Sequence, residues 1–336
     1  MVGIKDVAEA AGVSVATVSR VLTKHTNVRP VVRERVLEAV KQLNYRPNLV
    51  ARSLRSQQTK TIGLIVSDIR NPFFSSISRA VEDTAYEQGF SVLLCNADEN
   101  PEKEALYLNL LRDENVAGVI FSPTLHAINN FKELKLDFPI VIIDRSIKNG
   151  SVDSVLLDNV TAAYQLTAHL IQNGYRRIGA IFGVPSMTAI ERQQGYEEAL
   201  HAHSLMVVPR LIKHAQPKLE AGYTATQELL EMAQPPDAIF TGNGLLGAGA
   251  MTAIRERNWL IPEQIALVTF DDTNWATLVQ PAITVVAQPT DEIGKIATEL
   301  LLQRVAEPER PARKIILQGK LLIRGSSAAR NPLTTL

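Results

Sequence analysis

The sequence predicts a small all-α helix-turn-helix head followed by an α/β core of two doubly wound lobes. Three observations support this fold class: apolar residues at helical spacing in the first 45 residues, a basic charge excess confined to the first 60, and short apolar runs that alternate with amphipathic segments after Lys60. The chain has 336 residues, of which 46% are hydrophobic. This length suits two or three folded units, and the composition is ordinary for a globular protein.

The charge distribution divides the chain after Lys60. Residues 1–60 contain eleven Lys or Arg and four acidic residues, a net charge of +7, and the rest of the chain carries −7, so the total is zero. A basic head on a mildly acidic body is typical of a nucleic-acid reader joined to a second functional unit.

Composition and motifs also exclude several classes of protein. No stretch approaches the ~18 consecutive apolar residues of a membrane span, and Asp6 and Glu9 stand where a signal peptide needs a basic and then an apolar segment. The single cysteine, Cys95, cannot form an internal disulfide, which favours a reducing, cytoplasmic location. The chain contains no GxGxxG after its first strand, no P-loop, no HExxH and no GxSxG, so we expect neither an enzyme nor a cofactor or metal site.

The head is predicted to contain three short helices. Apolar residues recur at helical spacing in residues 4–11, Gly12 and Val13 interrupt the pattern, and Ser14 can cap a second helix over residues 15–22. A third helix is indicated for residues 32–43. Any small helical hairpin shows such a pattern, and the basic surface is what favours DNA as the partner, with the second helix in a major groove.

Two segments within residues 3–58 resemble the amino terminus of the lactose and galactose repressor family of bacterial transcription regulators. They are IKDVAEAAGVSVATVSRVL and LNYRPNLVARSLR. The resemblance implies that Val15, Ala16 and Arg20 meet base edges and that Ser14 and Tyr45 contact phosphates. Because Val15 and Ala16 offer only apolar contact, Arg20 is expected to carry the hydrogen-bonded readout.

Residues 47–58 match the hinge helix of that family. The segment is shorter than a stable isolated helix, so we expect it to order only on DNA. The resemblance implies a near-palindromic operator bound by a homodimer whose two Leu54 side chains enter the minor groove, with Ala51 and Arg55 beside them.

The body is predicted to consist of strands and helices in alternation. Strands are expected at residues 62–66, 92–95, 119–122 and 140–143 in the first lobe, and at 178–182, 211–213, 238–241 and 266–270 in the second. Helices are expected near 74–88, 103–114 and 127–134, and then near 189–201, 223–232 and 245–258. Residues 285–287 and a helix at 291–306 are expected to return to the first lobe before strands at 315–317 and 321–323.

The predicted domains are residues 1–46, the hinge 47–58 and a two-lobed effector-binding and dimerisation domain, 59–336. Lobe 1 is about 60–159 plus 290–318, and lobe 2 is about 160–288 plus 320–336, with crossings near Asn159, Gln288 and Gln318. This arrangement resembles the family's core and the periplasmic sugar-binding proteins.

Open α/β sheets bind ligands beyond the carboxyl ends of their strands, so the cleft between the lobes is the expected effector site. Polar and aromatic residues in such positions are the candidates: Arg70, Phe74, Asp144, Arg145, Arg192, Asn243 and Asp271. Each can equally be a helix cap or a turn residue.

Three of these candidates, Arg70, Arg145 and Arg192, favour an acidic effector such as gluconate or 2-ketogluconate, with Lys218 as a further cation. Gly244, where many relatives of the family carry an acid, points the same way. Nearby carboxylates could instead match the arginines internally, so a neutral sugar or a sugar phosphate stays open as the alternative.

Overall fold

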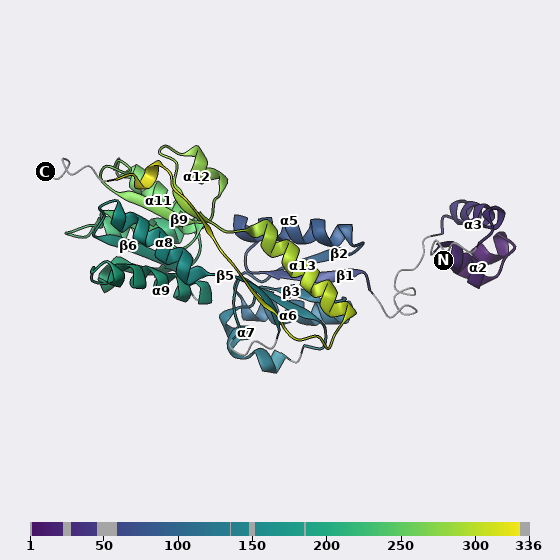
Figure 1. Cartoon of the computed structure of the whole chain (residues 1–336). Helices are drawn as coiled ribbons and strands as arrows, with labels where there is room; N and C mark the ends of the chain where they lie inside the picture. Colours follow the sequence, from purple (N-terminus) through teal and green to yellow (C-terminus); the bar gives the residue numbers. More distant parts are fainter. Residues whose placement is uncertain are drawn as a thin grey trace. The chain divides into compact units, whose positions relative to one another are not determined.

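The computed structural model describes residues 2–22, 28–45, 59–134, 136–147, 152–184 and 186–329. The chain divides into two compact units, Met1–Thr59 and Lys60–Leu336 (Figure 1). The expected hinge helix at 47–58, with Ala51, Leu54 and Arg55, lies outside the described residues.

The described residues of the first unit form three helices, α1 (Ile4–Ala10), α2 (Val15–Leu22) and α3 (Pro30–Gln42). Gly12 makes the turn between the first two helices with φ +62°, a conformation that glycine adopts without strain. The helices meet in a small apolar core built from Val7, Ala8, Ala11, Val18, Val21, Val36 and Ala39.

The first lobe of the second unit is built on a six-stranded parallel sheet with strand order β11-β5-β4-β3-β1-β2. Its strands are β1 (Thr61–Val66), β2 (Ser91–Asn96), β3 (Val119–Phe121), β4 (Ile140–Ile143), β5 (Asp153–Leu157) and β11 (Lys314–Leu317). Alternate residues of β1 point to opposite faces, so Ile62 and Leu64 pack under α5 (Pro72–Glu87) and α13 (Thr290–Ala306), and Ile65 packs under α6 (Pro101–Asp113) and α7 (Leu125–Asn129). A 3-10 turn, η1 (Phe131–Leu134), follows α7.

The second lobe repeats the plan with strand order β12-β10-β9-β8-β6-β7, in which only β12 runs antiparallel to its neighbour. Its strands are β6 (Ile178–Gly183), β7 (Ile212–Ala215), β8 (Ala238–Thr241), β9 (Ala266–Phe270), β10 (Thr284–Ala287) and β12 (Lys320–Leu322). The flanking helices are α8 (Asn159–Gln172) and α9 (Met187–Ala202) on one face and α10 (Leu219–Leu230), α11 (Gly244–Glu256) and the short α12 (Asn274–Leu278) on the other, with 3-10 turns η2 (Pro209–Leu211) and η3 (Gly325–Ser327).

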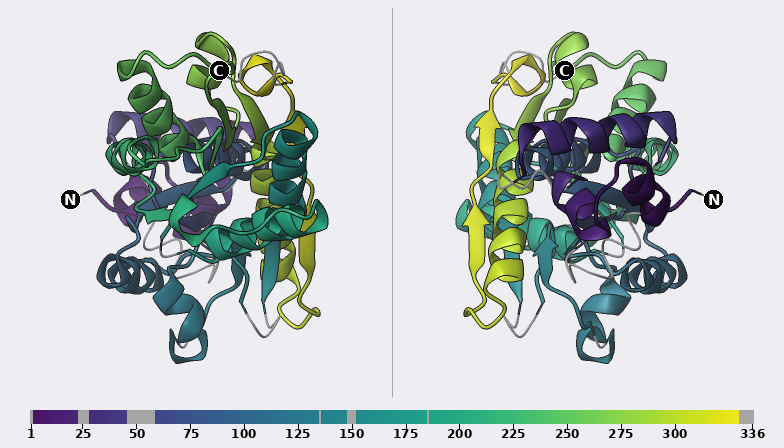
Figure 2. Two further views of the ribbon diagram at one scale, coloured as in Figure 1. Left: turned by 90° about the vertical axis from the view of Figure 1, so that its left-hand side faces the viewer. Right: turned by 90° about the vertical axis from the view of Figure 1, so that its right-hand side faces the viewer.

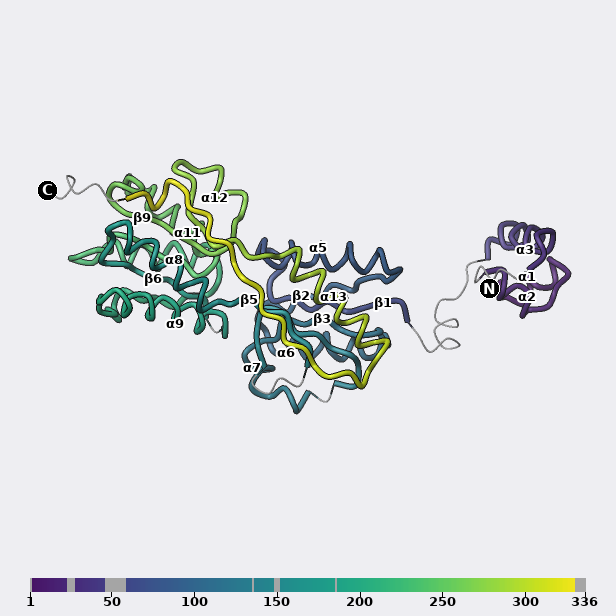
Figure 3. Tube along the Cα trace, in the orientation of Figure 1, coloured from purple at the N-terminus to yellow at the C-terminus, as the bar shows by residue number. Residues whose placement is uncertain are grey.

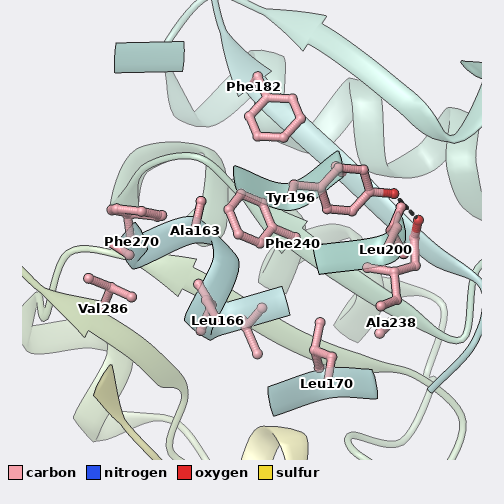
Figure 4. Packing of buried hydrophobic residues seen from close by; sticks show 14 of the residues in the cluster. Ala163, Leu166, Leu170, Phe182, Tyr196, Leu200, Ala238, Phe240, Phe270 and Val286 are labelled. Carbon is pink, nitrogen blue, oxygen red and sulfur yellow. Dashed lines mark hydrogen bonds between the residues drawn. The ribbon is translucent and has the colours of Figure 1, made fainter. Parts of the chain in front are cut away.

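An aromatic cluster fills the core of this lobe beneath α8 and α9 (Figure 4). The rings of Phe182, Tyr196 and Phe240 lie 5.5–6.0 Å apart, and the Tyr196 hydroxyl donates to the Ile178 carbonyl at 2.7 Å. This rigid core anchors α9, which carries Arg192, and β9, which ends directly before Asp271.

The chain crosses between the lobes three times, from β5 to α8, from β10 to α13 and from β11 to β12 (Figure 3). Asn159, Gln288 and Gln318 lie at these three crossings. Figure 2 shows β11 and β12, in yellow, running along one side of the body from one lobe to the other.

Two expectations for this region need correction. Residues 285–287 do not return to the first lobe, because β10 pairs in parallel with β9, and the return begins only at Gln288. The sequence reading also missed β5 and α8. The first residue of β5, Asp153, is fully buried, and ion pairs to Arg304 and Arg310, some 150 residues away, offset the cost of burying its charge.

Candidate functional site

The predicted DNA-contacting residues of the head fall into an exposed group and a packed group. Ser14, Ala16 and Arg20 are exposed, and the last two lie four residues apart on α2 and so share one face. Val15 and Tyr45 are half-buried against the core of the head. The Ser14 hydroxyl accepts a hydrogen bond from the Thr17 amide at 3.2 Å, so it caps α2 as expected, and it shares a second hydrogen bond with the Thr17 hydroxyl at 2.9 Å.

In the second unit a cavity of about 240 Å³ lies between the lobes, at the carboxyl ends of both sheets. Six of the seven candidate effector residues line it: Phe74, Asp144, Arg145, Arg192, Asn243 and Asp271. The sequence reading missed several further lining residues, among them Asp98, Glu99 and Gln288. Asp98 and Glu99 follow β2 closely, so the strand-end rule that found the others could have found them too.

Arg70 is the exception, because it does not line the cavity. Its side chain is 70% exposed, and its Nε donates to Asp68 at 3.3 Å. Asp68 does line the cavity, so Arg70 acts from outside as the counter-ion of a lining carboxylate. The pair raises the pKa of Arg70 through that hydrogen bond.

Four carboxylates of the lining stand on left-handed backbone. The φ angles are +53° at Asp98 and Glu99, +68° at Asp144 and +73° at Asp271. Non-glycine residues adopt this region at a conformational cost, and they concentrate at functional sites. The backbone therefore turns sharply after β2, β4 and β9 to aim acidic side chains into the cleft.

All three guanidinium nitrogens of Arg145 hydrogen-bond to other groups of the protein. Both terminal nitrogens donate to Glu99, Nη1 also donates to the Pro123 carbonyl at 2.8 Å, and Nε donates to Asp144 at 3.2 Å. Its side chain is 5% exposed. Burial raises the pKa of Asp144, and the positive charges of Arg145 and Arg192 oppose that rise.

Arg192 lies on α9 and is held on three sides. Nε donates to Asn159 Oδ1 at 2.8 Å, Nη1 donates to the Gly242 carbonyl, and the guanidinium lies 4.0 Å from the centre of the Phe270 ring. Its Nη2 makes no hydrogen bond to any described residue. Both N–H donors of this nitrogen are therefore unused by the described residues, and burial lowers the pKa of the guanidinium.

Asp271 and Asn243 are positioned by the start of α11. Asp271 Oδ2 accepts from the Gly244 amide at 3.0 Å, and Oδ1 accepts from Gln288 at 2.6 Å. Asn243 caps α11 by accepting from the Leu246 amide at 2.9 Å, which leaves its NH₂ group for the cleft. A Cβ at position 244 would lie 3.1 Å from the Thr273 methyl and 3.3 Å from the Asp271 Cβ, so glycine lets this corner close tightly.

The lining contains more carboxylates than cations. Its acids are Asp68, Asp98, Glu99, Asp144 and Asp271, and its cations are Arg145, Arg192 and Lys218. Asp98 also pairs with Lys103 at 3.7 Å. The rings of Phe73 and Phe74 meet edge to face at 4.9 Å and give the cleft an apolar wall. Such a mixture of matched polar groups and an aromatic wall suits a small polyhydroxylated ligand.

Within the described part of the chain, no group of three or more His, Cys, Asp or Glu could hold a metal ion. None of the described helices is long and apolar enough to cross a membrane.

Comparison with known proteins agrees with this architecture. Residues 3–48 match the model of the bacterial regulatory proteins of the lacI family, and residues 59–324 match the periplasmic binding proteins and sugar-binding domain of the LacI family. The chain is 36% identical over 333 residues to the HTH-type transcriptional regulator RegA of Clostridium saccharobutylicum (96% of this chain, 98% of RegA). It is also 36% identical over 325 residues to the ribose operon repressor of Halalkalibacterium halodurans, covering 96% of each chain.

Among solved structures, the lac repressor dimer bound to operator and the anti-inducer ONPF matches with a TM-score of 0.87 and 26% identity, covering 98% of this chain and 99% of that one. A helix-turn-helix head on a two-lobed α/β core defines a DNA-binding transcription regulator with a ligand-binding domain. The chain belongs to the LacI family of such regulators.

Proposed function

We propose that this regulator represses a carbohydrate operon and that its effector is a neutral monosaccharide held in the cleft between the lobes. The observation that supports this proposal most strongly is the charge balance of the lining, which contains five carboxylates and three cations, and one of these cations, Arg145, is already paired with Glu99 and Asp144. The cavity of about 240 Å³ also falls below the ~300–1,000 Å³ of pockets for drug-sized ligands, which favours a single sugar ring.

The lining supplies donors and acceptors for such a ring. Arg192 Nη2 and the Asn243 amide are donors, and the carboxylates of Asp144 and Asp271 accept from ligand hydroxyls. Phe74 can cover the apolar face of the sugar. The name of the related ribose operon repressor is consistent with a ligand of this size.

The arginines that favoured gluconate or 2-ketogluconate are less available than the sequence suggested. Arg70 lies outside the lining, and Arg145 is taken up by Glu99 and Asp144. Two lining cations, Arg192 and Lys218, form no ion pair with a described residue, and Lys218 supports a sugar acid as the second candidate. In that case one cation, and not a cluster of arginines, would hold the ligand carboxylate.

Isothermal titration calorimetry with ribose, galactose, fructose phosphate, gluconate and 2-ketogluconate separates the two candidates. A neutral sugar is expected to bind equally well to the wild type and to Lys218→Met. Binding of an acid that Lys218→Met abolishes would overturn the neutral assignment. Lys213→Met serves as the matched control, because Lys213 pairs with Glu228 outside the lining.

The proposal includes a homodimer that reads a near-palindromic operator in the cytoplasm. Strand β2 is the edge of its sheet, and Leu93 and Leu94 on it are 40% and 47% exposed. An exposed apolar edge strand promotes association with other chains unless another surface covers it. We propose that a second copy of this chain covers it, because a near-palindromic operator is read by two copies related by two-fold symmetry. Leu94→Asp is therefore expected to shift the sedimentation of the protein from dimer toward monomer, and an unchanged dimer would place the interface elsewhere.

The cleft is proposed to bind its ligand without transforming it. Three of its five carboxylates, Glu99, Asp144 and Asp271, accept hydrogen bonds from Arg145, Gly244 or Gln288, an arrangement that fixes them as acceptors. Recovery of the effector unchanged after prolonged incubation with the protein is the expected result.

A further inference from the structure

We propose that Asn159 and Gln288 are positioning residues that couple occupancy of the cleft to the angle between the lobes. The proposal rests on the proposed function of the cleft as the effector site. It concerns three side-chain amides, Asn159, Gln288 and Gln318, one at each crossing between the lobes, which we call the crossing amides.

Asn159 ties the first crossing to Arg192. It stands at the start of α8, directly after the chain leaves the sheet of the first lobe, and it is 2% exposed. Its Oδ1 accepts from Arg192 Nε at 2.8 Å, and its Nδ2 donates to Glu191 at 2.8 Å. The guanidinium that offers Nη2 to the ligand is thus fixed, through its other edge, to a crossing segment.

Gln288 ties the second crossing to Asp271. It follows β10 and precedes α13, which packs on the first lobe. Its Nε2 donates to Asp271 Oδ1 at 2.6 Å, and its own carbonyl accepts from the Thr290 amide at 2.9 Å. The carboxylate offered to the ligand is therefore bonded to the segment that leads back to the other lobe.

Gln318 provides an internal contrast at the third crossing. Its Nε2 donates to Asp158 at 3.3 Å, and Asp158 caps α8 through the Thr161 amide. Neither Gln318 nor Asp158 lines the cavity. The third crossing thus carries an amide of the same kind with no direct bond to a cleft residue.

The hydrogen bonds Asn159–Arg192 and Gln288–Asp271 connect the two charged groups offered to the ligand with two of the crossing segments. Hydrogen bonds to a guanidinium or a carboxylate are among the stronger ones in proteins, so Arg192 and Asp271 cannot reorient without moving the amides that hold them. Domain rotation is absorbed by dihedral changes at a few such connecting residues. A ligand that engages both charged groups then favours one lobe angle over the other, which is the differential interaction that coupling requires.

Electron–electron double resonance with two spin labels tests this without knowledge of the effector. Labels at Glu102→Cys and Glu220→Cys, in exposed positions near the starts of α6 and α10, report the distance between the lobes in full-length protein carrying Cys95→Ser. In the absence of ligand, Gln288→Met and Asn159→Leu are expected to broaden or shift the distance distribution. Gln318→Met is expected to leave it as in the wild type.

Unchanged distributions in Gln288→Met and Asn159→Leu, or an equal change in Gln318→Met, would overturn the proposal. Gln288 is only half-buried, so Gln288→Met decides the matter alone if Asn159→Leu does not fold. Melting temperatures measured in parallel show whether stability changes together with the distance. A second series, measured on the wild type with d-ribose and with d-galactose, tests the effector assignment separately. If neither sugar shifts the distance distribution of the wild type, the effector assignment is contradicted, and the comparison of the variants without sugar still tests the crossing amides.

Discussion

Replacing Asp271 by Asn changes the charge at the centre of the proposed effector site and little else. The carboxylate accepts one hydrogen bond from the Gly244 amide and one from Gln288. An asparagine keeps an acceptor for the Gly244 amide, and its NH₂ group can donate to the Gln288 carbonyl oxygen once that amide turns over. Both bonds are then retained, so the free energy of unfolding is expected to change by about 1 kcal/mol or less.

The effect on the ligand is larger. A hydrogen bond to a charged group contributes ~1.5–3 kcal/mol, whereas a neutral one contributes ~0.5–1.5 kcal/mol. Loss of the charge should therefore cost about 1–2 kcal/mol of binding free energy, or roughly a 5- to 30-fold increase in effector Kd. Titration calorimetry measures this Kd directly, and thermal unfolding verifies the fold.

The neighbouring residue provides the matched control. Asp272 pairs with Arg324 at 2.7 Å, is 30% exposed at its side chain and does not line the cavity. Asp272→Asn is expected to change the effector Kd less than two-fold. Equal effector affinity in Asp271→Asn and the wild type, or an equal loss in both variants, would refute the assignment of Asp271 as a ligand acceptor.

Three further predictions address other parts of the chain. Arg70→Ala should leave the effector Kd within two-fold of wild type, because the side chain is 70% exposed and does not line the cavity, and calorimetry showing a loss above five-fold would return Arg70 to the site. Arg20→Ala should weaken the operator by roughly 1–3 kcal/mol and relax the preference at one guanine per half-site, which footprinting detects; an unchanged base preference contradicts the readout. Burial lowers the pKa of His169, which hydrogen-bonds Ser327, below its value in the unfolded chain. As the pH falls below about 6.5, the unfolded state therefore binds a proton at His169 before the folded state does, and the folded state loses stability. The melting temperature should thus drop less between pH 7.5 and 5.5 in His169→Gln than in the wild type, and parallel curves would exclude this role.

Local patterns were sufficient to predict the head and most of the body. The valines and alanines of residues 4–22 recur at helical spacing around one glycine, so α1, α2 and the turn between them follow from the sequence. Strand β5 was not predicted because its first residue, Asp153, is charged and was not expected to be buried. Its burial depends on two arginines that only the fold brings near.

The same limit explains the arginines of the cleft. Arg70 and Arg145 both follow strands, and the strand-end rule treats them alike. Arg70 turns outward to Asp68, two residues away, whereas Arg145 is drawn inward by Glu99, a residue 46 positions earlier on another strand end. Local sequence therefore located most of the candidate residues that line the cavity, whereas long-range pairing decides which cations of the lining are ion-paired within the protein.

The central claim is that a ligand in the cleft controls operator binding by the head of the same chain. It is tested most directly by fluorescence anisotropy on a DNA duplex recovered by selection from random sequences with the full-length protein. The neutral sugar that binds in calorimetry should change the Kd for this duplex by about 5- to 150-fold, and saturating duplex should change the Kd for the sugar by the same factor. A sugar that binds the cleft and leaves the duplex Kd unchanged would contradict the account.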